Sequence, residues 1–274
     1  MTLRLALYGK GGIGKSTLAT HLSTAFARKG LRVLHIGCDP KSDSVRNLAK
    51  ERIPTVLETL SKTPTPTQEE LLFPGAFGVT LVEAGGPVAG QGCAGLGILA
   101  MADTLERLGV FAEGWDIILY DVLGDVVCGG FAMPMRQGFV DRVFLVTSAE
   151  YMALYAANNI LKGIAHYERG RPLLGGILHN RCHDDGDRRI VEEFASAVGG
   201  HLLPSIPDSS ALRQADFLGR TVHEMDPEGE MSSLFLSIAK EILALCPTHA
   251  TALSEERLRS LGGDGDALSS TRIL

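Results

Sequence analysis

The chain has 274 residues, of which 45% are apolar and 21% charged, so it contains enough apolar material for a globular core and is not a disordered polyelectrolyte. Its formal net charge of −6 disfavours a broad nucleic-acid surface, and no segment approaches the ~18 consecutive apolar residues of a membrane span. The N-terminal residues look like a first strand rather than a signal peptide. Five cysteines, an odd number, are too few for a disulfide scaffold and favour a reducing compartment. We therefore expect a cytoplasmic protein that binds neither nucleic acid nor a membrane.

Short apolar runs alternate with longer helical patterns along the chain. The runs predicted as strands are Leu3–Tyr8, Arg32–Gly37, Val79–Glu83, Trp115–Tyr120, Arg142–Thr147, Leu173–Leu178 and His201–Ile206. The predicted helices are Lys15–Lys29, Ile98–Leu108, Met152–Arg169, Arg188–Val198, Ser210–Leu218 and Ser232–Leu245. Such alternation predicts an α/β fold, with a mostly parallel sheet of seven to eight strands flanked by helices. We predict one domain over residues 1–247 and a C-terminal extension over 248–274.

A glycine-rich segment follows the first predicted strand and opens the first predicted helix, which is the setting of a phosphate-binding loop. The motif G-x-x-x-x-G-K-[ST] is matched by Gly9-Lys10-Gly11-Gly12-Ile13-Gly14-Lys15-Ser16-Thr17. Glycines allow backbone N–H groups to turn onto phosphate oxygens, and the helix N-terminus adds its positive dipole end. Lys15 is expected to reach the β- and γ-phosphates, and Ser16 to ligate Mg²⁺. The domain is therefore predicted to be a P-loop NTPase.

Lys10 is a second lysine inside this loop. The pattern resembles the deviant Walker A motif of dimeric ATPases, in which the early lysine reaches the nucleotide of the other subunit. This resemblance implies a dimer that closes around ATP. The alternative is that Lys10 is a solvated loop lysine.

Carboxylates follow two of the predicted strands, at the strand ends where open α/β sheets bind ligands. Asp39 and Asp43 come after the second strand, whereas Asp121 ends another strand and is the Walker B candidate. Asp125 follows shortly after, and Gly124 offers a pivot about which this segment could move as a switch. The alternative for each aspartate, and above all for Asp43, is a helix cap or an Asx turn.

Two cysteines, Cys93 and Cys128, lie in glycine-rich settings, each just after a predicted strand. The chain has no C-x-x-C, so a self-contained zinc ribbon or ferredoxin-type cluster is not encoded. Two chains around a two-fold axis would supply the four thiolates of a [4Fe–4S] cluster; the alternative is two buried cysteines in turns. Cys38, Cys182 and Cys246 are interpreted as buried structural thiols.

Several segments together resemble the nitrogenase iron protein family, which includes the ATP-dependent reductases of nitrogenase-like enzymes. The matching segments are Gly9–Thr17, Gly37–Asp43, Gly85–Pro87, Gly90–Gly95, Tyr120–Pro134 and Tyr155–Ile160, within a similarity that runs from residue 3 to about 245. The resemblance implies a homodimer with one [4Fe–4S] cluster held by Cys93 and Cys128 of both chains. MgATP hydrolysis would drive electron transfer to a separate catalytic heterotetramer, with ferredoxin or flavodoxin as the electron donor.

The resemblance also implies roles for individual residues. The catalytic residues would be Lys10, Lys15, Asp39 and Asp125. The nucleotide-binding residues would be Gly11, Gly12, Ile13, Gly14, Lys15, Ser16, Thr17, Lys41, Asp43, Asp121 and Asn180, the last on the adenine side. Only seven residues separate Asp121 from Cys128, so a shift at the γ-phosphate must displace the cluster loop.

Two departures from the family pattern affect the predicted partner and substrate. Leu96 stands where the family has an arginine that faces the catalytic component, and Ile206–Ser209 replaces the expected Pro-Arg-Asp near the nucleotide. We predict the reductase of a nitrogenase-like system such as methylthio-alkane reductase, with true dinitrogen reduction as the alternative. A tetrapyrrole reductase is less favoured, because those enzymes usually carry Gly-Cys-Gly-Gly where this chain has Gly-Cys-Ala-Gly. A partitioning ATPase would need a basic surface or a membrane helix, and a cluster-carrier ATPase normally has a C-x-x-C.

Overall fold

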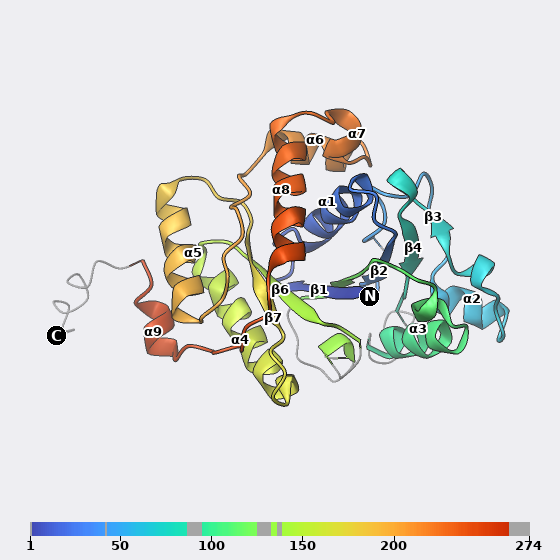
Figure 1. Cartoon of the computed structure of the whole chain (residues 1–274), viewed down its shortest axis with the longest axis horizontal. Coiled ribbons are helices and arrows are strands. Elements are labelled where there is room, and N and C mark those ends of the chain that lie inside the picture. The colour runs from blue at the N-terminus through green and yellow to red at the C-terminus, as the bar shows by residue number, and fades with distance from the viewer. Residues whose placement is uncertain (1, 42, 87–94, 125–132, 136–138, 263–274) are drawn as a thin grey trace, which may run out of the picture.

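The computed structural model describes residues 2–41, 43–86, 95–124, 133–135 and 139–262. Its centre is a seven-stranded sheet with the strand order β3-β4-β2-β5-β1-β6-β7 (Figure 1). The strands are β1 (Leu3–Gly9), β2 (Val33–Cys38), β3 (Phe73–Pro74), β4 (Thr80–Glu83), β5 (Ile117–Val122), β6 (Arg142–Thr147) and β7 (Leu174–His179). The pairs between β4 and β7 along this order are parallel, and β3 is antiparallel to β4. The predicted α/β fold with a mostly parallel sheet is therefore confirmed.

Helices cover both faces of this sheet (Figure 1). They are α1 (Lys15–Arg28), α2 (Val56–Lys62), α3 (Gly95–Arg107), α4 (Tyr151–Glu168), α5 (Asp185–Ala197), α6 (Ser210–Phe217), α7 (Val222–Met225), α8 (Glu230–Ala244) and α9 (Glu255–Arg259). Alternate residues of β1 enter different cores: Leu5 and Leu7 pack with α1 and α8, whereas Ala6 and Tyr8 pack with α3, α4 and α5. This period of two explains why the strand reads as one continuous apolar run. In the part of the chain described, no helix is long and apolar enough to span a membrane.

The predicted strand His201–Ile206 is wrong. The segment runs beside β7 and donates from Leu203 N to Ile177 O at 3.0 Å, but it makes only isolated bridges. Pro204 lies in the middle of the segment and has no N–H group to donate to a ladder. The two-residue strand β3 was not predicted, because it is too short to show an alternating pattern.

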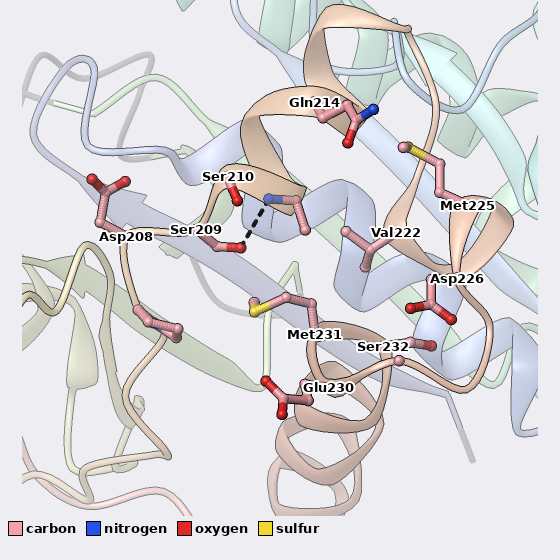
Figure 2. A pocket seen from close by; sticks show the side chains of 13 residues that line it. Asp208, Ser209, Ser210, Gln214, Val222, Met225, Asp226, Glu230, Met231 and Ser232 are labelled. Atoms are coloured by element: carbon pink, nitrogen blue, oxygen red, sulfur yellow. Dashed lines mark hydrogen bonds between the residues drawn. The ribbon is translucent and has the colours of Figure 1, made fainter.

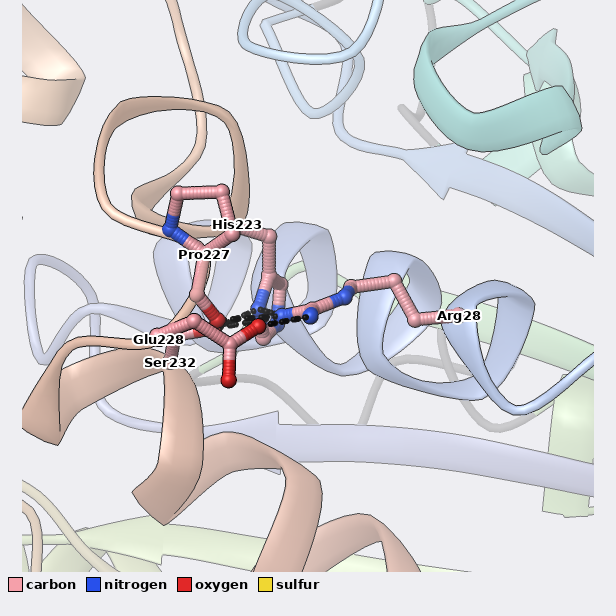
Figure 3. A network of polar contacts seen from close by, with 5 residues as sticks. All are labelled: Arg28, His223, Pro227, Glu228 and Ser232. Atoms are coloured by element: carbon pink, nitrogen blue, oxygen red, sulfur yellow. Dashed lines mark hydrogen bonds and ion pairs between the residues drawn. The ribbon is translucent and has the colours of Figure 1, made fainter.

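A partly buried polar network fastens α1 to α7 and α8 (Figure 3). The Nη1 atom of Arg28 donates to Ser232 Oγ at 2.7 Å and to the carbonyl of Pro227 at 2.8 Å, and lies 3.2 Å from His223 Nδ1. His223 Nδ1 is also 2.6 Å from Ser232 Oγ. Burial lowers the pKa of His223 to about 4, so the ring is neutral and its nitrogens divide into one donor and one acceptor.

A second histidine, His21, extends this network towards the phosphate loop. Its Nε2 atom accepts from Val222 N at 3.1 Å, so its Nδ1 atom carries the proton and donates to Thr17 O at 2.6 Å. The ring stacks on Phe235 of α8, with centroids 4.9 Å apart. Burial lowers the pKa of His21 to about 4. The first turn of α1 is therefore held in place by α7 and α8.

Residues 248–262 pack on α4, α5 and β7. Thr248 pairs with Leu174 of β7 through two backbone hydrogen bonds of 2.8 and 3.0 Å. The buried Glu168 carboxylate at the end of α4 accepts from Ala250 N at 2.8 Å. Asn158 of α4 bonds both the N–H and the carbonyl of Leu253, at 2.7 and 2.9 Å. These contacts attach the segment along its length.

Candidate functional site

A cavity of about 320 Å³ opens where the carboxyl ends of β1, β2 and β5 meet the first turn of α1. Parallel α/β sheets bind ligands at this edge, because strand ends and helix N-termini point into the same space. The cavity is lined by Gly11, Gly12, Gly14, Lys15, Ser16, Thr17, Asp39, Lys41, Asp43, Asp121, Val122, Leu123 and Arg181. Ten of these residues were predicted from the sequence: nine for nucleotide binding, and Asp39 as a catalytic residue.

The phosphate loop has the backbone that its glycines permit. Gly12 and Gly14 have φ angles of +75° and +99°, in the left-handed region that L side chains rarely adopt. A Cβ atom on Gly14 would lie 2.4 Å from Asn180 Nδ2, so this position also needs glycine for space. Lys15 is 7% exposed, and its ammonium group donates to Lys10 O at 3.1 Å. The phosphate loop therefore holds the Lys15 ammonium group at the wall of the cavity.

Two residues at the end of β7 brace the loop from the other side. Asn180 Nδ2 donates to Ile13 O at 2.7 Å, and Arg181 Nη2 donates to Gly12 O at 2.8 Å. Arg181 was not predicted from the sequence, since no motif contains it. It has a φ of +58°, which turns the chain out of β7 towards the loop.

Several predicted residues do not line this cavity. Lys10 contributes its carbonyl to the loop, but it is not among the lining residues, and Ile13 is buried in the core at 3% exposure. Asp125, Cys93 and Cys128 lie outside the described residues, so the structure does not test their predicted roles.

Asp121 is the most buried acid of the cavity, at 2% exposure. Its Oδ2 atom accepts from Ser44 Oγ at 2.6 Å, and the side chain of Ser16 also hydrogen bonds to it. Ser44 in turn lies 2.9 Å from His35 Nε2, and Ser23 Oγ lies 2.8 Å from His35 Nδ1. Ser44 donates its hydrogen to Asp121, so it accepts from His35 Nε2. The Nδ1 atom of His35 then accepts from Ser23, and the hydrogen bonds run in one direction from Ser23 to the carboxylate. Burial lowers the pKa of His35 to about 3 and raises that of Asp121, so the ring is neutral.

The turn after β2 carries the remaining predicted carboxylates. Asp39 Oδ1 accepts from Lys41 N at 2.9 Å, which is an Asx turn. The Asp43 carbonyl accepts from Arg46 N at 3.3 Å. The Asx turn that the sequence left open as an alternative is thus present at Asp39, and the same residue still lines the cavity.

A second cavity of about 180 Å³ continues from the phosphate loop. It shares Gly14, Thr17 and Arg181 with the first, and its far wall is formed by Asn180, Pro207, Asp208, Ser209, Leu212, Arg213 and Asp216. Arg213 forms an ion pair with Asp208 across this wall. The departure from the family pattern at Ile206–Ser209 therefore falls on the wall of a cavity that adjoins the phosphate loop.

A third cavity, of about 720 Å³, lies beyond that wall between α6, α7 and α8 (Figure 2). Asp208 and Ser209 line both cavities, and Ser209 Oγ accepts from Ala211 N at 3.2 Å to cap α6. Met231 and Glu230 reach into it from the start of α8. Asp208 and Ser209 therefore separate the second cavity from the third.

The cysteines outside the glycine-rich loops differ from one another. Cys38 and Cys182 are buried, as the sequence predicts. For Cys246 the prediction of a buried thiol is wrong: it is exposed, because it follows the end of α8 at the surface.

Comparisons with known proteins agree with this geometry. The family model described as 4Fe-4S iron sulfur cluster binding proteins, NifH/frxC family, matches residues 3–266. Nitrogenase iron protein 2 of Methanothermobacter thermautotrophicus is 49% identical over 240 residues, covering 87% of this chain and 89% of the relative. Nitrogenase iron protein 2 of Methanobacterium ivanovii is 47% identical over 242 residues, covering 88% and 90%.

Among solved structures, the septum site-determining protein MinD of Pyrococcus horikoshii, complexed with Mg-ADP, aligns with a TM-score of 0.69. It is 22% identical, and the alignment covers 89% of this chain and 98% of that one. At this identity the likeness shows the P-loop ATPase fold alone. The family model and the relatives show more: the chain belongs to the nitrogenase iron protein family of 4Fe-4S cluster-binding proteins.

Proposed function

We propose that the chain forms a homodimer in which MgATP hydrolysis drives electron transfer from a shared [4Fe–4S] cluster to the catalytic heterotetramer of a nitrogenase-like enzyme. Its family consists of ATP-dependent, cluster-binding reductase components. The observation that carries the proposal is the convergence of Lys15, Ser16 and Asp121 on one cavity at the end of a parallel sheet. Ferredoxin or flavodoxin would supply the electrons, and the cytoplasm is the compartment that suits free thiols.

The nucleotide phosphates fit the first cavity. The loop glycines line the same cavity as Lys15, whose ammonium group would move from the Lys10 carbonyl to the β- and γ-phosphates. The hydroxyl group of Ser16 already hydrogen bonds to Asp121, so both side chains can face one Mg²⁺ ion, Ser16 directly and Asp121 through water. Asp39 and Asp125 would orient the attacking water.

The base and ribose fit the second cavity. It adjoins the loop at Gly14 and Thr17, and the amide of Asn180 lines it. Lys41 and Asp43, in the turn after β2, line the first cavity with the phosphate loop. Lys10 would reach the nucleotide of the other subunit, which agrees with its absence from the lining of its own cavity.

Cys93 and Cys128 of each chain would hold the cluster, which supplies a low-potential electron donor when it is bound. The glycines beside both thiols would bring backbone N–H groups near the sulfur atoms and stabilise their negative charge. The described part of α3 begins two residues after Cys93 and exposes Leu96 by 56% and Leu99 by 37%. This apolar surface beside the cluster site is unlike the arginine that the family places there, and it supports a catalytic partner such as methylthio-alkane reductase.

A true nitrogenase iron protein is the second candidate. The relatives of 47–49% identity carry that name, and the similarity covers most of the chain. Combining the purified protein with each class of catalytic heterotetramer distinguishes the two candidates. Ammonia from dinitrogen supports the second, and thiol release from a methylthio-alkane supports the first.

The cluster assignment is tested by anaerobic purification. We expect brown protein with about four irons per dimer. The variants Cys93→Ser and Cys128→Ser should lose the iron, whereas Cys246→Ser, which alters an exposed thiol, should keep it. Colourless anaerobic protein with an intact fold, or equal loss in Cys246→Ser, would contradict the assignment. Lys15→Gln should keep the cluster and stop ATP-driven reduction.

A further inference from the structure

A buried carboxyl group outside the predicted site lies beside Asp121. Glu83 is the last residue of β4 and is 1% exposed. Gly37 of β2 is paired with Glu83 on one side and with Asp121 on the other, so the three residues form a row across neighbouring parallel strands. A Cβ atom on Gly37 would lie 2.1 Å from Glu83 Oε2, which shows that this carboxyl group occupies the space that a side chain on β2 would need.

The two carboxyl groups hold the same dipeptide. Asp121 accepts from Ser44 Oγ at 2.6 Å, and Glu83 Oε1 accepts from Val45 N at 3.0 Å. Ser44 and Val45 directly follow Asp43, and they are buried at 1% and 3% exposure. The turn that lines the nucleotide cavity is therefore attached to the ends of β5 and β4 at once.

The Glu83 carboxyl group is also unusual because it is protonated and because one of its oxygens has no hydrogen-bond partner in the described part of the chain. Burial, together with the negative charges of Asp121, Asp43 and Asp39, raises its pKa to about 8, so it is protonated at neutral pH. Burial also raises the pKa of the Cys38 thiol, one residue after Gly37 on β2, so that thiol is neutral. Oε2 has no hydrogen-bond partner in the described part of the chain. A buried polar atom left unpaired costs free energy, and the hydrogen bond from Val45 N to Oε1 offsets part of that cost.

We propose that Glu83 is a positioning residue of the nucleotide site, which holds the turn carrying Asp43 against the end of β4 while Asp121 holds it against β5. Nucleotide-driven movement of this turn then pulls on both strand ends. Asp121 precedes Cys128 by seven residues, and Glu83 precedes Cys93 by ten. Each proposed ligand is thus joined by a short covalent segment to a carboxyl group that hydrogen bonds to the turn. The inference rests on the proposed function, because it takes these cysteines as the cluster ligands.

The test compares Glu83→Ala with Glu83→Gln in the anaerobically purified dimer. The readout is the rate at which an iron chelator removes the cluster, with MgATP and without it. Gln is neutral like the protonated Glu83 and keeps an oxygen for Val45 N–H, so its response to MgATP should stay within about twofold of the wild type. Ala has no acceptor, and its MgATP-induced change in rate should fall by about tenfold, in the range of typical coupling between two sites.

Glu168→Ala is the matched control, since Glu168 is another buried glutamate that accepts a backbone N–H, from Ala250, but far from the nucleotide. It should respond to MgATP like the wild type. If Glu83→Ala fails to fold, Glu83→Asp is used instead, because its shorter carboxyl group cannot reach Val45 N.

The outcomes separate this inference from the proposed function. A full MgATP response in Glu83→Ala would overturn it, as would a loss in Glu83→Gln or an equal loss in the Glu168→Ala control. Wild-type protein without iron would instead contradict the proposed function, and that result is read before any variant is compared.

Discussion

The close approach of Gly124 to the phosphate loop predicts that Gly124→Ala weakens nucleotide binding. Gly124 lies two residues after the end of β5, and a Cβ atom there would be 1.6 Å from Gly9 O and 2.5 Å from Lys15 Nζ. Gly9 cannot retreat easily, because it ends β1 and is paired with Val146 of β6. The added methyl group must therefore move the loop, the Lys15 side chain or the segment after β5.

The size of the effect follows from these distances. Gly124 and Gly9 would have to separate by about 1.4 Å to reach the 3.0 Å below which real Cβ contacts are not found. Overpacking of this kind costs about 1–3 kcal/mol, which leaves a domain of ordinary stability folded. Displacing Lys15 from the phosphates removes a charge-assisted hydrogen bond of about 1.5–3 kcal/mol, so the Kd for MgATP should rise by about 10- to 100-fold.

Titration calorimetry measures the Kd for MgATP directly, and Gly109→Ala is the control variant. Gly109 has a positive φ of +75°, and a Cβ atom there meets nothing within 4 Å, so this variant tests an added methyl group without the close packing. That variant should lose about 1 kcal/mol of stability through backbone strain and keep its affinity. If Gly124→Ala binds MgATP as tightly as the wild type, or if Gly109→Ala binds as weakly, the packing argument is refuted.

Three further predictions concern stability and the base side of the site. Because burial lowers the pKa of His21 from 6.5 to about 4, the unfolded chain binds a proton more tightly than the folded chain below pH 6.5. The contribution of His21 to the free energy of unfolding should therefore fall by about 2 kcal/mol between pH 7 and pH 5. Urea titrations should show a smaller pH dependence in His21→Gln; an unchanged slope would contradict a neutral buried ring. Asn180→Ala removes the brace on the phosphate loop, so calorimetry should show weaker MgATP binding, whereas unaltered affinity would exclude a role for this amide. Asn158→Ala removes both hydrogen bonds to Leu253, and limited proteolysis should then cleave residues 248–262 faster, a result that equal protection would contradict.

The strands could be predicted from the sequence where burial on both faces produces unbroken apolar runs. The prediction for β6, Arg142–Thr147, matches its observed bounds, and β1 extends one residue beyond Leu3–Tyr8. The failure at His201–Ile206 has a local cause, since apolar residues there surround a proline that cannot donate to a ladder. Apolar content predicts where a segment is buried, but hydrogen-bonding capacity decides whether it becomes a strand.

The functional site also contains residues that could be predicted from the sequence and residues that could not. The phosphate loop could be predicted because its chemistry lies within nine consecutive residues, Gly9–Thr17. Arg181 and Glu83 could not, because each acts on a segment more than 35 residues away in sequence that only the sheet brings close. A weak signal existed for Glu83, a carboxylate that ends an apolar strand, as Asp121 does. A single carboxylate at a strand end does not reveal its partner.

The fold itself does not account for an iron–sulfur reductase, since a MinD structure of 22% identity has the same P-loop ATPase architecture. What this chain adds lies beyond the carboxyl ends of β4 and β5, where the sequence places Cys93 and Cys128. Glu83 is the last residue of β4 and Asp121 the last but one of β5; both carboxyl groups hold the turn after β2, and that turn lines the phosphate cavity. In this arrangement any displacement caused by hydrolysis reaches two strand ends together. A cluster attached beyond both ends would therefore sense the nucleotide through two short covalent paths, without a separate relay domain.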